Sequence, residues 1–129
     1  MTYLSCNEIL QIMKDLGHKP TFTREYAFEF ILKNEQYVYV KRLQDTKKIT
    51  PEPSRLMIHP LFEALKEDLQ KIDHVAFNFS EKGNMNSAFA RFPTSNQSQC
   101  EDNPTQYGIG VNFGDRQALL NFLDFIQSL

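Results

Sequence analysis

The sequence lacks the features that mark several common classes of protein. It has no tryptophan and only two cysteines, Cys6 and Cys100, which stand far apart and form no C-x-x-C motif. Small secreted domains use a denser cysteine framework, so we expect reduced thiols. The apolar runs are only a few residues long, whereas a membrane-spanning helix needs about 20 apolar residues. The chain also opens without the pattern of a secretion signal, so we expect a cytoplasmic protein that makes no membrane contact.

The sequence has no strong excess of either charge, but its charges are unevenly distributed. Its 129 residues carry a formal net charge of -2, and 41% of them are hydrophobic. This length and composition predict one domain over residues 1–129. Between Lys33 and Arg55, six basic residues stand against three acidic ones. A local excess of cations suits an anionic partner.

Hydrophobic periodicity predicts the first elements of the chain. Over residues 5–16 a capping box opens an apolar stripe at helical spacing, which predicts a short helix. From residue 22 to 32 the pattern changes to alternation, which predicts one continuous strand. A polar turn over residues 33–36 then predicts an antiparallel hairpin with a second strand over residues 37–42.

The rest of the chain repeats these two patterns. Pro60 suits the first turn of a helix that we predict over residues 61–72, and Asp115 opens a C-terminal helix with an apolar stripe. Prolines and polar residues predict surface loops over residues 43–54 and 93–106. Further strands are predicted over residues 55–58, 74–80 and 87–92, the last two forming a hairpin, and in the segment YGIGVNFG. This order predicts an α+β fold with two to three helices packed on a mainly antiparallel sheet of about five to six strands.

Four segments carry a resemblance to a known family. They are YVYVKR, LMIHP, QYGIGVNF and, directly after the last, RQALLNFL. At these segments, and in their order, the chain resembles the YgaC-like proteins, a family of small uncharacterised bacterial cytoplasmic proteins. The resemblance implies a small cytoplasmic protein and leaves the function open.

The strongest candidate for a binding site is the basic region around the two central strands. Its cations can meet phosphates, its tyrosine rings can stack on unpaired bases, and a planar guanidinium near a strand end suits a carboxylate or phosphate. In the alternative interpretation, the tyrosines pack beneath a helix and the charges only keep an edge strand soluble. The candidate residues are Tyr37, Tyr39, Lys41, Arg42, Lys47, Lys48 and Arg55.

Two further residues are candidates outside this region. His59 ends a strand just before a helix, where it can meet a ligand or cap the helix. The histidines and cysteines show no metal-ligand spacing, and the segment GIGVNFG misses the dinucleotide fingerprint, so we predict neither a metal nor a cofactor. Arg116 lies in the first turn of a helix, which is unfavourable unless Asp115 or a bound anion offsets its charge. Arg116 is therefore a weaker candidate for contact with a partner.

These observations lead to three hypotheses about function. The first is a non-enzymatic, regulatory module that binds a protein or a small anionic ligand, because the sequence shows no catalytic constellation. The second is a nucleic-acid-associated module that uses the basic surface over residues 41–55. The third is an enzyme that uses His59 with Arg42 or Arg55 on a substrate bearing phosphate or carboxylate. They differ in whether the tyrosines, the arginines and His59 share one exposed surface.

Overall fold

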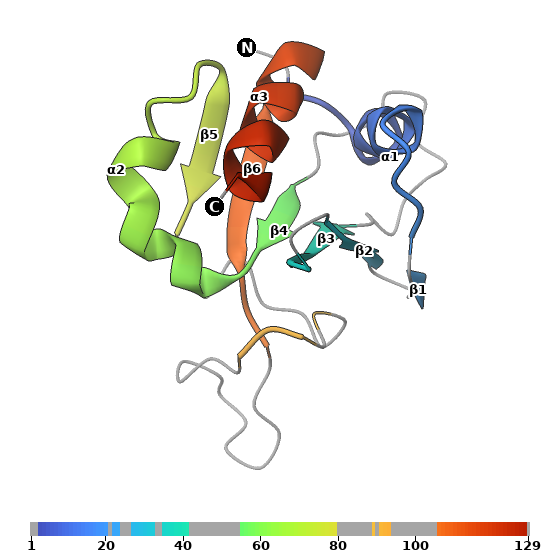
Figure 1. Ribbon diagram of the computed structural model, residues 1–129, viewed down its shortest axis with the longest axis horizontal. Coiled ribbons are helices and arrows are strands. Elements are labelled where there is room, and N and C mark those ends of the chain that lie inside the picture. The colour runs from blue at the N-terminus through green and yellow to red at the C-terminus, as the bar shows by residue number, and fades with distance from the viewer. Residues whose placement is uncertain are drawn as a thin grey trace.

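One antiparallel sheet with helical segments packed on it forms the fold (Figure 1). The computed structural model describes residues 3–20, 22–23, 27–32, 35–41, 55–79, 89, 91–93 and 106–128, and at residues 22, 23, 27 and 41 the backbone alone. The strands of the sheet lie in the order β1 (Phe22–Thr23), β2 (Ala27–Ile31), β3 (Tyr37–Lys41), β4 (Leu56–Ile58), β6 (Ile109–Phe113) and β5 (Val75–Asn78). All neighbouring pairs are antiparallel, which confirms the predicted α+β fold.

The two long helices begin at the caps that the sequence predicts. Helix α1 (Cys6–Asp15) has a capping box in which the Ser5 hydroxyl accepts from the Glu8 N–H at 3.2 Å. The Glu8 carboxylate accepts from the Ser5 N–H at 3.1 Å. Helix α3 (Arg116–Gln127) begins after Asp115, whose carboxylate accepts from the Ala118 N–H at 2.8 Å. These bonds satisfy backbone donors that an uncapped helix would leave without a partner.

Both long helices lie on the same face of the sheet. In Figure 1, α1 lies over β2 and β3, and α3 lies over β6. In strands β2 to β6, the alternate residues that point toward the helices join the helix stripes in one apolar cluster. Its fully buried members include Ile9, Met13, Phe30, Val38, Val40, Leu56, Ile58, Val111, Phe113, Leu119, Phe122 and Ile126. No helix in the described ranges has the length and apolar character that crossing a bilayer requires.

The prediction of one continuous strand over residues 22–32 is wrong. The structure has two strands, β1 and β2, which pair antiparallel with Phe22 opposite Glu29 and Thr23 opposite Phe28. Alternation of apolar and polar residues is the same on both arms of a hairpin. The pattern therefore assigned faces to the side chains without showing that the chain turns back.

The prediction of a single α-helix over residues 61–72 is also wrong. A 3₁₀ helix, η1 (Pro60–Leu65), leads into one short α-helical segment, α2 (Lys66–Leu69). A 3₁₀ helix has three residues per turn, which aligns Phe62 with Leu65 and turns Leu61 away. Leu61 is accordingly 54% exposed, whereas Phe62 is buried.

The predicted hairpin between residues 74–80 and 87–92 lies largely outside the described residues, which do not include residues 80–88 and 90. Among the described residues, strand β5 pairs with β6, which follows more than thirty residues later, and Val75 lies opposite Phe113. Residues 89, 91 and 92 belong to no strand. Cross-strand pairs of large apolar residues with β6 stabilise this distant pairing, which no local turn signal could indicate.

Three predictions fall outside the described residues. They are the loop over residues 43–54, most of the loop over residues 93–106, and the positions of Arg42, Lys47, Lys48 and Cys100.

Candidate functional site

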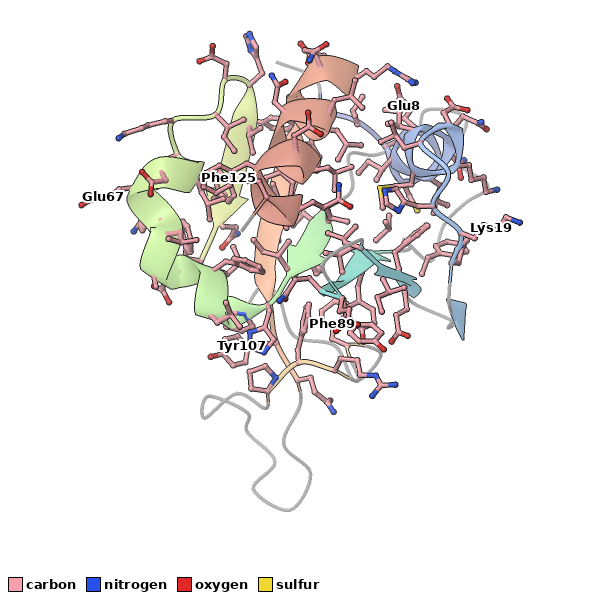
Figure 2. The ribbon with its side chains drawn as sticks, in the orientation of Figure 1. Glu8, Lys19, Glu67, Phe89, Tyr107 and Phe125 are labelled. Carbon is pink, nitrogen blue, oxygen red and sulfur yellow. The ribbon has the colours of Figure 1, made fainter. Side chains whose placement is uncertain are left out.

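The sheet face opposite the helices carries a small aromatic cluster. Alternation along β3 and β4 turns Tyr39 and Met57 to this second face, where both are fully buried. They are covered by Phe89 and Phe92, which belong to a short segment that we call the cover segment (residues 89 and 91–93). The Tyr39 ring lies 5.3 Å from the Phe89 ring and 4.9 Å from the Phe92 ring, centre to centre. In Figure 2, Phe89 lies below β3 while α1 lies above it.

The hydroxyl of Tyr39 joins the sheet to the cover segment. It donates a hydrogen bond to Glu29 Oε2 at 2.7 Å and accepts one from the Arg91 N–H at 3.0 Å. Glu29 lies directly opposite Tyr39 in the β2–β3 register. Tyr39 is 0% exposed and Glu29 is 7% exposed, so these polar groups depend on protein partners in place of water. The enclosed position of Tyr39 favours the packing interpretation over stacking on a ligand base.

A glycine allows the cover segment to lie close to the sheet. A Cβ atom at Gly108 would lie 2.8 Å from the Ile58 carbonyl oxygen and 2.8 Å from Cε2 of Phe92, which is closer than real contacts allow. The Tyr107 N–H next to this glycine donates to the Pro93 carbonyl at 3.0 Å. The cover segment is therefore held by backbone bonds as well as by its two phenylalanines.

Tyr37 and Arg91 form the accessible edge of this cluster. Tyr37 is half-buried against the cluster, and Arg91 is exposed. The guanidinium carbon of Arg91 lies 4.9 Å from the centre of the Tyr37 ring, which is a cation–π contact. A guanidinium has five N–H donors, so contact with one ring leaves donors for a carboxylate or a phosphate. Of the two predicted tyrosines, Tyr37 is the one whose ring a partner can reach.

His59 caps the 3₁₀ helix η1. Its Nδ1 accepts a hydrogen bond from the Leu61 N–H at 3.0 Å, and its ring packs against the edge of the cover segment. The centres of the His59 and Phe92 rings are 5.5 Å apart at an interplanar angle of 76°. Partial burial lowers the pKa of His59 below its usual value of 6.5. The structure thus supports the capping interpretation of His59.

Arg55 and His59 stand at opposite ends of β4. The pairing of Val40 with Leu56 places Arg55 level with Lys41 at one end of the β3–β4 pair, while His59 follows Ile58 at the other end. At about 3.3 Å per residue, four steps along a strand separate them by roughly 13 Å. An enzyme that uses His59 with Arg55 would therefore need a substrate that spans this separation, and the alternative partner, Arg42, lies outside the described residues.

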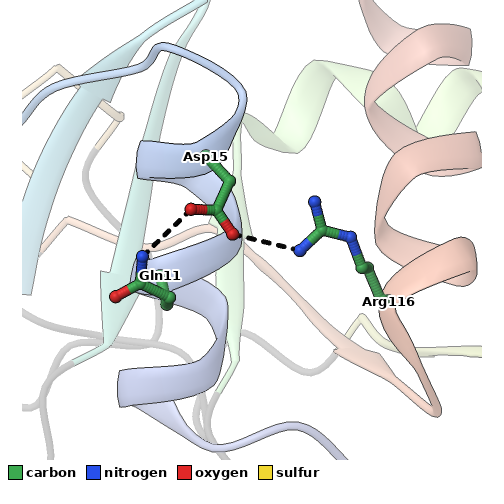
Figure 3. Close-up of polar contacts among 3 residues, drawn as sticks. All are labelled: Gln11, Asp15 and Arg116. Atoms are coloured by element: carbon green, nitrogen blue, oxygen red, sulfur yellow. Dashed lines mark hydrogen bonds and ion pairs between the residues drawn. The ribbon is translucent and has the colours of Figure 1, made fainter.

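Arg116 is engaged by a carboxylate of the protein itself. Its Nη1 lies 3.1 Å from Asp15 Oδ2, and this ion pair joins α3 to α1 (Figure 3). The other carboxylate oxygen of Asp15 accepts from Gln11 Nε2 at 3.0 Å. The Gln11 hydrogen bond first, and then that of Arg116, lowers the pKa of Asp15 below its usual value of 3.8. Asp15, with the cap at Asp115, is the anion that offsets the charge of Arg116.

Sequence reasoning missed three residues that shape this site. Arg91 and Phe92 lie in the segment 87–92, which the pattern predicts as a strand, and the alternation over residues 22–32 does not indicate that Glu29 is buried. The spacing of Phe89 and Phe92 by three residues is a signal for a turn with two inward aromatic side chains. It conflicts with the strict alternation of a strand.

Comparison with known proteins adds no family assignment. No model of a known protein family matches the sequence, and no curated protein is similar enough to count as a relative. The resemblance to the YgaC-like proteins therefore stays a prediction. In the described part of the chain, no group of three or more His, Cys, Asp or Glu side chains lies close enough together to hold a metal ion.

Proposed function

We propose that this protein is a non-enzymatic binding module whose partner contacts Tyr37 and Arg91 on the second face of the sheet. The observation that carries the proposal is the exposed Arg91 guanidinium over the half-buried Tyr37 ring. The Arg91 backbone is fixed by its bond to the Tyr39 hydroxyl. A cation and an aromatic ring held in fixed geometry form a recognition surface with little ordering cost on binding.

The chemistry of this surface selects an anionic group. The planar guanidinium of Arg91 suits a carboxylate or phosphate. The Tyr37 ring suits an apolar or planar group next to that anion. Arg55 is half-buried at the other end of the β3–β4 pair, level with Lys41, and is therefore not part of this surface. The partner class is accordingly an acidic protein segment or a small anionic ligand.

The remaining polar side chains of the second face favour binding over catalysis. Glu29 and Tyr39 are bonded to each other in the interior, and His59 uses Nδ1 to cap η1. A general base must reach a proton on the substrate. Glu29, Tyr39 and His59 instead stabilise the part of the fold that positions Tyr37 and Arg91.

Titration with defined probes tests this proposal. Poly-glutamate peptide, citrate and inorganic phosphate are added to the protein labelled for NMR, and amide shifts are followed. We expect shifts centred on Tyr37 and Arg91, lost in Arg91→Gln and weakened in Arg91→Lys, because lysine keeps the charge and loses the planar fork. Lys19→Gln removes an exposed cation elsewhere and should bind as the parent does. Undiminished binding by Arg91→Gln would contradict the proposal.

A nucleic-acid-associated module is the second candidate. The observation that favours it is the half-buried position of Tyr37 on the strand that leads into the basic residues 41–55. A single-stranded oligothymidine probe in the same titration separates the two functions. If the protein is a nucleic-acid module, its affinity for the oligonucleotide should fall steeply as the salt concentration rises. The affinity should fall further when Lys47 and Lys48 are changed to glutamate. Binding of the peptide without binding of the oligonucleotide excludes this candidate.

A further inference from the structure

The imidazole of His59 is shared by two parts of the structure. One ring nitrogen, Nδ1, accepts the Leu61 N–H at the start of η1. The ring also packs in an edge-on contact against Phe92 of the cover segment. A change in the charge of this ring therefore affects both the start of η1 and the cover segment over the aromatic cluster.

The bond to Leu61 requires the neutral ring. Because Nδ1 is the acceptor, the proton of the neutral imidazole resides on Nε2. A second proton can only be added at Nδ1, where it would point at the Leu61 N–H. Two donors would then face each other and the cap would be lost. The new positive charge would also lie beside the orphan N–H groups of the first helical turn, which is unfavourable.

The neighbouring charges do not compensate for this cost. The titratable or cationic groups on the elements around the ring are Glu63 on η1, Arg91 on the cover segment, Tyr37 on β3 and Tyr107 beside Gly108. Within the described residues, none of these side chains forms a hydrogen bond or ion pair with the imidazole. Burial is the cause that lowers the pKa of His59. The folded protein therefore favours the neutral ring.

We propose that His59 is a pH-responsive latch for the cover segment. The neutral ring holds the start of η1 and packs against Phe92, so that Phe89 and Phe92 stay on Tyr39 and Met57. Protonation removes the cap and loosens the contact with Phe92. The cover segment then opens more often, which exposes the aromatic cluster and separates Arg91 from Tyr37.

The direction of the pH effect follows from linkage. The pKa of His59 is lower in the folded protein than its usual value of 6.5. Between these two values the open or unfolded chain binds more protons than the closed form. His59 therefore stabilises the closed cover segment fully above pH 6.5. This stabilisation declines as the pH falls from 6.5 to the pKa of His59 in the folded protein, and it is lost below that pKa.

Hydrogen exchange on the full chain tests the latch without any ligand, so its result is independent of the proposed function. The readouts are the protection factors of the Arg91 amide, which is bonded to Tyr39, and of the Leu61 amide, between about pH 8 and about pH 5. We expect both to fall on acidification, by about tenfold for each pH unit of the window. Amides in α3 serve as the internal reference.

Two histidine variants make the test specific. His59→Asn keeps a side-chain acceptor at the cap position and cannot titrate, so the pH dependence should disappear. His74→Asn removes an exposed histidine with a positive φ of 62°, a conformation that asparagine tolerates, and should behave as the parent. The latch is overturned if Arg91 protection does not change with pH in the parent. It is equally overturned if Arg91 protection changes as much in His59→Asn, or if only Leu61 loses protection.

Discussion

The two faces of the sheet are stabilised in different ways. The face under α1 and α3 carries a large cluster of aliphatic and aromatic side chains. The second face carries Tyr39, Met57, Phe89 and Phe92, with one buried hydroxyl and one buried carboxylate at its side. The first face depends on the total apolar area that it buries, whereas the second depends on a few contacts of defined geometry.

This difference explains where a ligand surface can arise. On the helix-covered face, side chains from the helical segments and from strands β2 to β6 enclose one another. On the second face, the cover segment lies over Tyr39 and Met57 and places the exposed Arg91 guanidinium over the half-buried Tyr37 ring. Tyr37 is half-buried at this edge, where we propose that a partner binds. The following changes test this contrast, from the largest expected effect to the smallest.

Truncation of Phe122 tests the helix-covered face. The ring is fully buried and lies 5.3 Å from the Phe113 ring and 6.1 Å from the Phe77 ring. Phe122→Ala should lower the free energy of unfolding by about 3–5 kcal/mol, because it removes buried area and leaves a cavity. Urea denaturation measures the loss. The control Leu61→Ala, at an exposed residue, should change it by less than about 0.5 kcal/mol, and equal losses would contradict the assigned core.

Removal of one hydroxyl tests the second face. Tyr39→Phe keeps the ring but removes the donor to Glu29 and the acceptor of the Arg91 N–H, so we expect a loss of about 1–3 kcal/mol. Faster hydrogen exchange at Arg91, with unchanged exchange in α3, would place the loss on this face.

A double-mutant cycle isolates the bond between Tyr39 and Glu29. Glu29→Gln retains the shape of the side chain and removes its charge, and the two changes should combine to less than the sum of their separate losses. Strict additivity would mean that the hydroxyl and the carboxylate stabilise the fold independently.

The ion pair between the long helices should give the smallest effect on stability, because both partners are exposed and screened. In Arg116→Gln, the pKa of Asp15 should rise toward 3.8 but stay below it, since the Gln11 hydrogen bond is the larger cause of the lowering. An NMR titration of the Asp15 carboxyl group measures this. The contribution of Asp15 to stability is present above pH 3.8 and is lost as pH falls through the folded pKa.

Gln11→Ala is the matched control for this titration. This change removes the Gln11 hydrogen bond, which is the largest cause of the lowered pKa of Asp15. It should therefore raise the pKa of Asp15 further than Arg116→Gln does. The reverse order would mean that the ion pair dominates.

Local patterns predicted those elements whose signals lie within a few residues. The caps at Ser5 and Asp115 and the apolar stripe of α3 depend on neighbours in the chain, and all three are confirmed. The hairpin of β1 and β2 was missed because alternation of apolar and polar residues does not show where the chain reverses its direction. The pairing of β5 with β6 was missed because it joins distant segments.

The candidate site shows the same limit in two tyrosines of one strand. Tyr37 and Tyr39 have the same local pattern, and alternation correctly places both opposite Val38 and Val40. The partner that separates their roles is Arg91, whose backbone bonds Tyr39 across 52 residues. No property of the strand itself indicates that one ring is enclosed and the other is left at an edge.

The sequence by itself determined the faces of the central strands, the first turns of the long helices and the fold class, because period and capping are set by residues close together in the chain. The tertiary structure alone decided the strand order, the burial of Tyr39 with Glu29, and the contact of Arg91 with Tyr37. These features depend on which distant segments bury one another's apolar surface. That choice is made by the packing of the whole domain, and no local pattern encodes it.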